Sequence, residues 1–403
     1  MPLKAIDVYD PARYADGIPQ DDFRWLREND PVHRHADPEL PEGFWAVTRH
    51  ADVSRVSRTP DTFSSSRRTT MLGEVSEEEC AQQRMMMLNM DPPEHSRLRG
   101  LVSRGFTPKT IRLMGEHLRR TSELIVDRAL EAGSGDFVDL CAAELPLIVL
   151  AELMGVPVED RRKIFDWSNR LASATTTLRI EENEDAATAA IEVYAYANDL
   201  GIAKRACPAD DIVTTLISPD ESGQELSELE FDLFFLLLLF AGNETTRNAI
   251  SGGMLAMIEH PEQWERLRDN IDLAPQAAEE IVRWVSPVNS FRRTATRDVE
   301  LGGQPIQEGD KVIVFYSSAN YDESVFENPY AFDIGRSPNP HLGFGGGGPH
   351  FCLGRHLAAL EVEMMFRTLA TKLRGVELTG PVGRLSSNFV NGITSMPVRL
   401  IPA

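Results

Sequence analysis

One long helical pattern, from Ser227 to about Glu259, constrains the fold of this chain more than any other feature of its sequence. Ser227 is followed three residues later by Glu230, which is the spacing of a capping box, and Pro261 forbids a simple continuation. A helix of about thirty residues is longer than a typical globular helix. Residues 233–241 are apolar without interruption, so most sides of the helix must be buried. We therefore predict that this helix crosses the middle of the molecule.

The remaining pattern is mostly helical, with short strands near both ends of the chain. Apolar residues recur at three- and four-residue spacing between residues 93 and 242, and we expect further helices over 275–285 and from 353 to about 373. Strands are expected at 43–48, 299–301, 304–306 and 311–316, and residues 389–390 and 396–400 are β-like. No linker or repeat divides the 403 residues. The expected fold is mainly α with small β-sheets (α+β), in a single domain, 1–403.

Charge and hydropathy exclude several classes of protein. The formal net charge is −21, whereas a surface that binds nucleic acid is basic. The first residues contain no apolar core of signal-peptide length, and the longest apolar run is too short to span a bilayer. We expect a cytoplasmic protein with no membrane anchor and no nucleic-acid partner.

No two of the four cysteines are close enough in sequence to form a CxxC zinc or redox site. Cys80, Cys141 and Cys207 are interpreted as small buried hydrophobes. Cys352 differs because of its neighbours, and its surroundings suggest a chemical role for the thiol.

The segment 343–358 around Cys352 reads GFGGGGPHFCLGRHLA. Glycine runs occur where the backbone approaches another group closely or adopts positive φ, so this loop is suited to pass against a flat cofactor. The cysteine precedes a helix start, whose positive end stabilises a thiolate, and the N–H groups of Leu353 and Gly354 are placed to hydrogen-bond the sulfur. A phosphate cradle is the alternative, although neither a GxGxxG after a strand nor a GK[ST] accompanies the glycines.

This segment resembles the haem-binding loop of the cytochromes P-450. Phe344, His350, Cys352 and Gly354 match the Phe, the basic residue, the Cys and the Gly of that signature. The resemblance implies that Cys352 is the axial ligand of the haem iron, and that Phe344, His350 and Gly354 help to bind the haem. Phe344 stands eight residues before Cys352, one more than is usual in the family. This longer loop resembles a bacterial subgroup that hydroxylates steroid side chains and methyl-branched lipids.

Two further motifs stand at independent positions. Glu244 and Thr245 follow the apolar run, where burying a carboxylate without a partner is costly. Either an internal Arg or Lys pairs with Glu244, or the site is functional; the resemblance implies a catalytic acid–alcohol pair that delivers protons to dioxygen. Glu280 and Arg283 are three residues apart, a spacing common on helix surfaces. For this pair the resemblance implies a buried structural ion pair that holds the Cys loop.

The propionate groups of a haem b need cationic or hydrogen-bonding partners. His95 and Arg99 share one helix face at i, i+4, and the resemblance adds Arg293 and His350 to this set. A solvated histidine at a helix start is the alternative for His95. The family resemblance places the haem between the long central helix and the helix that follows the Cys loop.

The resemblance also implies an activity and its partners. One atom of O2 is inserted into a C–H bond of an apolar substrate, for which a steroid side chain, a terpenoid or a branched lipid is expected. Electrons come ultimately from NAD(P)H, through a ferredoxin reductase and a ferredoxin, to a monomeric enzyme. The residues expected to line the substrate pocket are Leu237, Leu238, Ala241, Val288, Phe291 and Ile393. A basic docking patch is expected from Arg97, Arg99, Arg104, Lys109 and Arg355.

Three other classes of function remain open. A peroxygenase or isomerase of the same fold usually lacks the acid–alcohol pair, which this chain has as Glu244 and Thr245. A haem sensor or carrier needs no proton relay, and turnover with a redox partner separates it from an enzyme. A binding protein whose Cys loop is coincidental would be colourless when purified.

Overall fold

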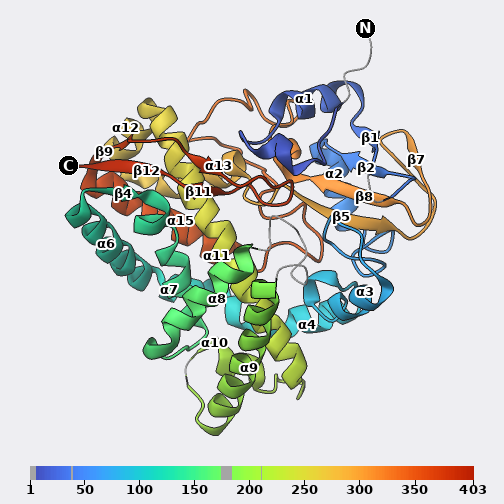
Figure 1. The fold of residues 1–403 in the computed structure, drawn as a ribbon, viewed down its shortest axis with the longest axis horizontal. Coiled ribbons are helices and arrows are strands. Elements are labelled where there is room, and N and C mark those ends of the chain that lie inside the picture. Colours follow the sequence, from blue (N-terminus) through green and yellow to red (C-terminus); the bar gives the residue numbers. More distant parts are fainter. Residues whose placement is uncertain (1–5, 38–39, 174–183, 210) are drawn as a thin grey trace.

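The computed structural model describes residues 6–37, 40–173, 184–209 and 211–403. At its centre lies α11 (Glu228–Glu259), a helix of 32 residues that crosses the molecule (Figure 1). Ser227 Oγ accepts a hydrogen bond from the Glu230 N–H, and the Glu230 carboxylate accepts one from the Ser227 N–H. The capping box and the central position of the helix are therefore confirmed.

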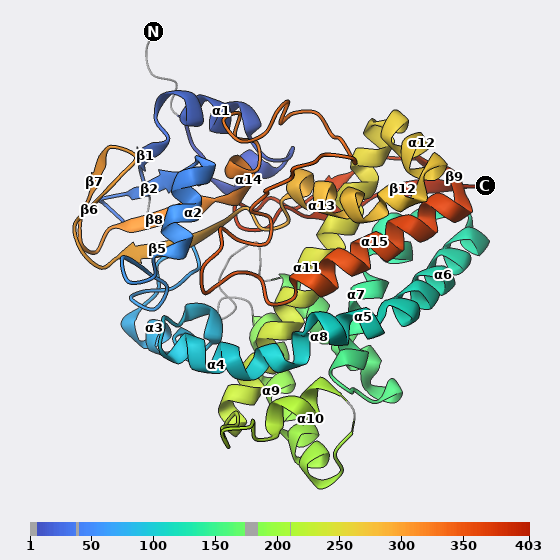
Figure 2. The same ribbon diagram turned by 180° about the vertical axis from the view of Figure 1, so that it is seen from behind.

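Helices surround α11 on several sides. The larger ones are α6 (Gly115–Ala132), α7 (Glu144–Leu153), α8 (Arg161–Ser173), α9 (Glu184–Ala206), α13 (Ala274–Val285) and α15 (Arg355–Lys372). The others are α1 (Gln20–Asn29), α2 (His50–Arg58), α3 (Glu77–Gln83), α4 (Glu94–Ser103), α5 (Pro108–Leu113), α10 (Ile212–Ile217), α12 (Pro261–Asp269) and α14 (Tyr316–Ala319). From behind, α15 is seen to run alongside α6 and α11, and it contacts both as well as α13 (Figure 2). Helices α13 and α15 match the two predicted over 275–285 and 353–373.

A five-stranded sheet lies at the other side of the molecule, away from α6 and α9 (Figure 1). Its order is β1 (Val32–His35), β2 (Phe44–Val47), β8 (Lys311–Phe315), β5 (Ser290–Ala295) and β3 (Phe63–Ser64). Only the β2–β8 pair is parallel, with Trp45 beside Val312. Every residue of β8 is buried, which explains why its apolar and β-branched run forms a strand in the middle of the sheet.

Smaller sheets complete the fold. They pair β4 (Ser134–Asp136) with β12 (Pro397–Pro402) and β9 (Leu373–Leu378), β6 (Val299–Leu301) with β7 (Gln304–Ile306), and β10 (Gly383–Arg384) with β11 (Ile393–Ser395). The mainly α fold with small sheets is thus confirmed. In the described parts of the chain, no helix has both the length and the apolarity needed to cross a membrane.

Some local expectations differ from the structure. The strand predicted to end at residue 316 ends at Phe315, because Tyr316 begins α14. Residues 389–390 form no regular strand, and Val390 makes only an isolated bridge with Val288. The region expected to be mostly helical between 93 and 242 is interrupted by β4, which pairs with β12 near the C-terminus. Periodicity alone does not reveal such a short strand, because its partner lies far away in the sequence.

Candidate active site

The loop before α15 places Cys352 two residues ahead of the helix N-cap, Gly354. The Cys352 N–H donates a hydrogen bond of 2.9 Å to the Phe344 carbonyl, which closes the loop on itself. Gly345 has φ +100°, a conformation that side chains disfavour. The glycine-rich segment therefore brings Phe344 and Cys352 together across eight residues of sequence.

Most of the glycines in this loop pack against α2. A Cβ atom at Gly346 or Gly348 would collide with Ser57, and one at Gly347 would lie 2.6 Å from the Arg58 guanidinium. Close packing against α2 is therefore a reason for glycine at these three positions. Gly354 does have open space where a side chain would lie.

Backbone N–H groups surround the sulfur of Cys352. Gly354 and Arg355 donate hydrogen bonds to it, so Arg355 takes the place that the sequence suggested for Leu353. Burial raises the pKa of the Cys352 thiol, whereas these donors and the positive charges of Arg99 and Arg355 favour the thiolate. A buried sulfur with two backbone donors is the arrangement that orients and tunes a thiolate ligand of a metal.

Four basic side chains that the sequence proposed as haem partners lie together near this loop. The His95 and His350 rings are 4.2 Å apart, and Arg99 Nη2 donates to the Phe351 carbonyl at 2.5 Å. Arg293 projects from β5, is 4% exposed, and donates to the Arg292 carbonyl at 2.7 Å. In the portions of the chain that the structure covers, none of the four forms an ion pair with a carboxylate.

This cluster has the electrostatics of an anion site. Burial and the charges of Arg99 and Arg293 lower the pKa of His95 to about 4. The Nδ1 atom of His95 is buried without a hydrogen-bond partner among the described residues. Asp91 lies nearby, but its carboxylate accepts hydrogen bonds from Ser64, Ser65 and Ser66. Concentrated buried positive charge with an orphaned donor fits the propionate groups of a haem.

A polar segment interrupts the apolar sequence of the buried helix α11. Glu244 is 5% exposed; its Oε1 accepts from Arg247 Nη2 at 2.5 Å and from Asn248 Nδ2 at 3.2 Å. Its Oε2 is buried and has no partner in the described residues. An internal ion pair, the first of the two expected readings, is therefore present, but it satisfies only one carboxylate oxygen.

Thr245 and Ala241 lie one turn apart on α11. Thr245 Oγ1 donates to the Ala241 carbonyl at 2.9 Å. Ala241 is exposed although its helix neighbours Leu239 and Asn243 are buried. An exposed alanine within a central helix indicates open space beside it, on the face that also carries Thr245.

Glu280 and Arg283 form a fully buried ion pair on α13, with contacts of 2.7 and 2.8 Å. Arg283 also donates to the carbonyls of Asn320 and Pro329, and Glu280 accepts from Arg336. Asn320 Oδ1 in turn accepts from the Leu342 N–H. The pair thus connects α13 to the chain that leads into the Cys loop. Asn320 and Arg336 carried no signal in the sequence, because their partners are distant along the chain.

The six expected pocket residues do not share one cavity wall. Leu237, Leu238 and Ala241 lie on α11, Phe291 lies on β5, and Val288 precedes that strand. Phe291 packs against Tyr316 and Phe389. Ile393 lines a different cavity with Asn248 and Leu255, and none of the other five residues lines that cavity.

Known proteins resemble the chain over nearly its whole length. It is 46% identical to a steroid C26-monooxygenase of Rhodococcus jostii (strain RHA1), over 98% of this chain and 84% of that protein. It is 40% identical to a methyl-branched lipid omega-hydroxylase of Mycobacterium bovis (strain ATCC BAA-935 / AF2122/97), over 93% of this chain and 90% of that protein.

Solved structures share the fold. A Mycobacterium marinum cytochrome P450 in complex with pseudoionone has a TM-score of 0.89 and 38% identity, with 99% of both chains covered. The model of the cytochrome P450 family matches residues 155–374, more than half of the chain. On these matches, the chain belongs to the cytochrome P450 family.

Proposed function

We propose that this protein is a haem-thiolate monooxygenase that hydroxylates the terminal carbon of a branched, apolar chain. One oxygen atom of O2 enters the C–H bond, and the other leaves as water with two electrons and two protons. Haem b, when bound, supplies the activation of dioxygen, and thiolate ligation favours O–O cleavage. The chain's own residues hold the cofactor, exclude water and move protons.

The observation that carries this proposal is that Cys352 lies close to a cluster of basic side chains. The Cys352 sulfur, with its N–H donors from Gly354 and Arg355, would ligate the haem iron. His95, Arg99, Arg293 and His350 hold the propionates, which supply the negative charge that the cluster lacks. Phe344 and Gly354 would flank the cofactor. The proposed haem site lies between α11 and the start of α15.

The acid and the alcohol on α11 complete the reaction. Glu244 and Thr245 pass protons toward dioxygen on the Ala241 side of the helix. A peroxygenase would not need this pair, and a sensor or carrier would not need a proton supply. Both residues therefore favour oxidative turnover over the other activities of the fold.

The substrate class follows from what two relatives have in common. One is named for carbon 26 of a steroid and the other for the omega carbon of a methyl-branched lipid. Carbon 26 ends the side chain of a steroid, and the omega carbon ends the chain of a lipid. A primary C–H bond is stronger than the neighbouring tertiary one, so attack at the end requires that the pocket position the chain. Leu237, Leu238 and Ala241 on α11 supply apolar walls for this purpose.

The electron supply is proposed to be NAD(P)H, through a ferredoxin reductase and a ferredoxin. The P450 fold covers 99% of this chain, so the electrons are proposed to arrive from separate proteins. Because NAD(P)H is a cytoplasmic reductant, the proposal places the protein in the cytoplasm, where it works as a monomer.

The first test is the absorption spectrum of the reduced protein with carbon monoxide, for the native chain and for Cys352→Ala. A strongly red-shifted Soret band in the native protein, lost in the variant, is expected from thiolate ligation. A band typical of histidine-ligated haem in both proteins would remove the thiolate mechanism. Absence of any haem band, with adequate haem supply, would overturn the proposal.

The substrate class is tested separately with matched ligands. A steroid with a branched side chain should shift the haem spectrum and be hydroxylated at its terminal carbon, and a methyl-branched fatty acid should do the same. The same steroid nucleus without a side chain serves as the control. If the control is bound and hydroxylated equally well, terminal-carbon specificity is wrong while the monooxygenase activity stands.

A further inference from the structure

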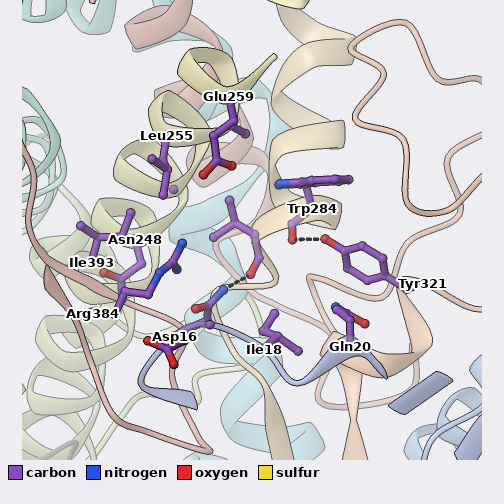
Figure 3. A pocket seen from close by; sticks show the side chains of 15 residues that line it. Asp16, Ile18, Gln20, Asn248, Leu255, Glu259, Trp284, Tyr321, Arg384 and Ile393 are labelled. Atoms are coloured by element: carbon purple, nitrogen blue, oxygen red, sulfur yellow. Dashed lines mark hydrogen bonds between the residues drawn. The ribbon is translucent and has the colours of Figure 1, made fainter. Parts of the chain in front are cut away.

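A cavity lies along α11, beyond the polar segment that carries Glu244. Its volume is about 210 Å³, and Asp16, Gln20, Asn248, Glu259, Arg384 and Asn391 are among its walls. Figure 3 shows the side chains of Glu259 and Arg384 extending into it from different elements. Since one water occupies about 30 Å³, several waters fit. The polar walls suit water and are wrong for an apolar substrate.

The cavity and the acid–alcohol pair share one face of α11. Thr245, Asn248, Gly252, Ala256 and Glu259 follow at three- and four-residue spacing, which places them in a row along the helix. The last four of these residues line the cavity. Asn248 stands at its inner end, one turn after Glu244, whereas Glu259 is exposed at the end of the helix. The row therefore leads from the surface to the catalytic pair.

Asn248 connects the cavity to Glu244 through a single amide group. Its Nδ2 donates to Glu244 Oε1 at 3.2 Å, and only the N–H side of an amide can face a carboxylate in this way. Its Oδ1 is buried without a hydrogen-bond partner in the described chain, on a residue that is 1% exposed. A Cβ atom at Gly392 would lie 3.1 Å from both amide atoms, so the amide is closely confined. Asn248 lines the cavity, so a water there can supply the missing partner of Oδ1.

We infer that this cavity is a water inlet for protons, and that Asn248 positions both the Glu244 carboxylate and the innermost water. The inference rests on the proposed function, because it assigns a source to the protons that Glu244 delivers. A water held by Asn248 Oδ1 gives a proton to the unpartnered Glu244 Oε2 after each delivery. The hydroxide left behind takes a proton along the water chain from solvent near Glu259. The relay transfers protons only, and no group in it is oxidised or reduced.

The test compares Asn248→Leu with Asn243→Leu in the holoenzyme, using the alcohol formed per NAD(P)H consumed. Asn243 is the matched control, because it lies on the same helix, is equally buried and bonds to Ser168 instead of Glu244. Asn248→Leu should lower alcohol formation by up to about 100-fold, with electrons diverted to peroxide and an increased solvent deuterium isotope effect. The spectrum with carbon monoxide and substrate binding should not change.

A second variant keeps the inference testable if Asn248→Leu folds poorly. Ala256→Leu narrows the cavity between Asn248 and Glu259 and does not alter Glu244, so it should give the same loss of coupling. A readout independent of activity is the crystal structure of the native protein. It should contain an ordered water within hydrogen-bond distance of Asn248 Oδ1, continued by others toward Glu259.

Different outcomes separate the two proposals. If Glu244→Gln keeps full coupling, the acid role of Glu244 in the proposed function is wrong. If Glu244→Gln uncouples the enzyme but Asn248→Leu and Ala256→Leu behave like Asn243→Leu, only the water inlet is wrong. A crystal structure with no water at Asn248 Oδ1 would also refute the inlet.

Discussion

Glu361 is a carboxyl group enclosed in α15, 3% exposed, with one oxygen that has no hydrogen-bond partner among the described residues. Burial raises the pKa of Glu361 to about 8. In the folded protein the side chain is therefore neutral at pH 7, whereas in the unfolded chain it is ionised. Folding must take up a proton there, so stability falls as the pH rises from the unfolded pKa, about 4.5, to about 8.

The substitution Glu361→Gln should remove this pH dependence. Relative to the native protein, the variant should gain free energy of unfolding as the pH rises from 5 to 8.5, on the order of a few kcal/mol. Urea denaturation of both proteins across this range measures the difference. Glu131→Gln, on the exposed side of α6, is the control for the substitution itself. A difference between Glu361→Gln and native protein that stays constant with pH would contradict the expectation.

At the scale of elements, α11 depends on its N-terminal cap as well as on packing. Ser227 and Glu230 satisfy two backbone N–H groups that otherwise have no partner within the helix. Since α11 contacts α7, α8, α9, α13 and α15, loosening its first turn affects the middle of the helical region.

Ser227→Ala should lower the free energy of unfolding by about 1 kcal/mol, the usual value of a serine cap. Thermal or urea unfolding measures the change. Ser222→Ala is a suitable control, because this hydroxyl lies in the loop before α11 and donates a hydrogen bond to Asp220. Equal stability losses in the two variants would argue against a specific contribution of the cap.

At the scale of the whole molecule, the proposed electron carrier would have to dock on an acidic chain. The net charge is −21, so docking of an acidic ferredoxin needs a local basic surface. Two residues of the expected basic docking patch have partners within the chain. Arg97 forms an ion pair with Glu230, and Arg104 donates to two backbone carbonyls. Lys109 and Arg112 remain exposed on α5, which contacts α15.

Reversing the charge at Lys109 should therefore weaken ferredoxin-supported turnover. Lys109→Glu should reduce the rate roughly tenfold at low salt, with a smaller effect as salt screens the charges. Arg374→Glu makes a matched charge reversal on β9, beyond the far end of α15. Equal rates for the two variants would refute docking at α5, and substrate-induced spectral shifts should be the same in both.

The sequence by itself determined the parts of this protein whose causes are local. The capping box and Pro261 set the ends of α11, and the order of Cys352, Gly354 and the following helix predicted the loop that the structure shows. The pairing of 299–301 with 304–306 was also predictable, since a tight Gly-Gly turn joins the two strands. Hydrogen bonds between near neighbours and the spacing of apolar residues can both be recognised in a short stretch of sequence.

Only the tertiary structure decided which distant residues pack against each of these elements. The glycines before Cys352 pack against Ser57 and Arg58, almost three hundred residues earlier, and Glu280 gains Arg336 as a second partner. The position of Ile393 beside Asn248, and the cavity they share, arise where α11 meets β11. Such contacts carry no local signature, because they depend on how distant surfaces fit together when the whole core is buried.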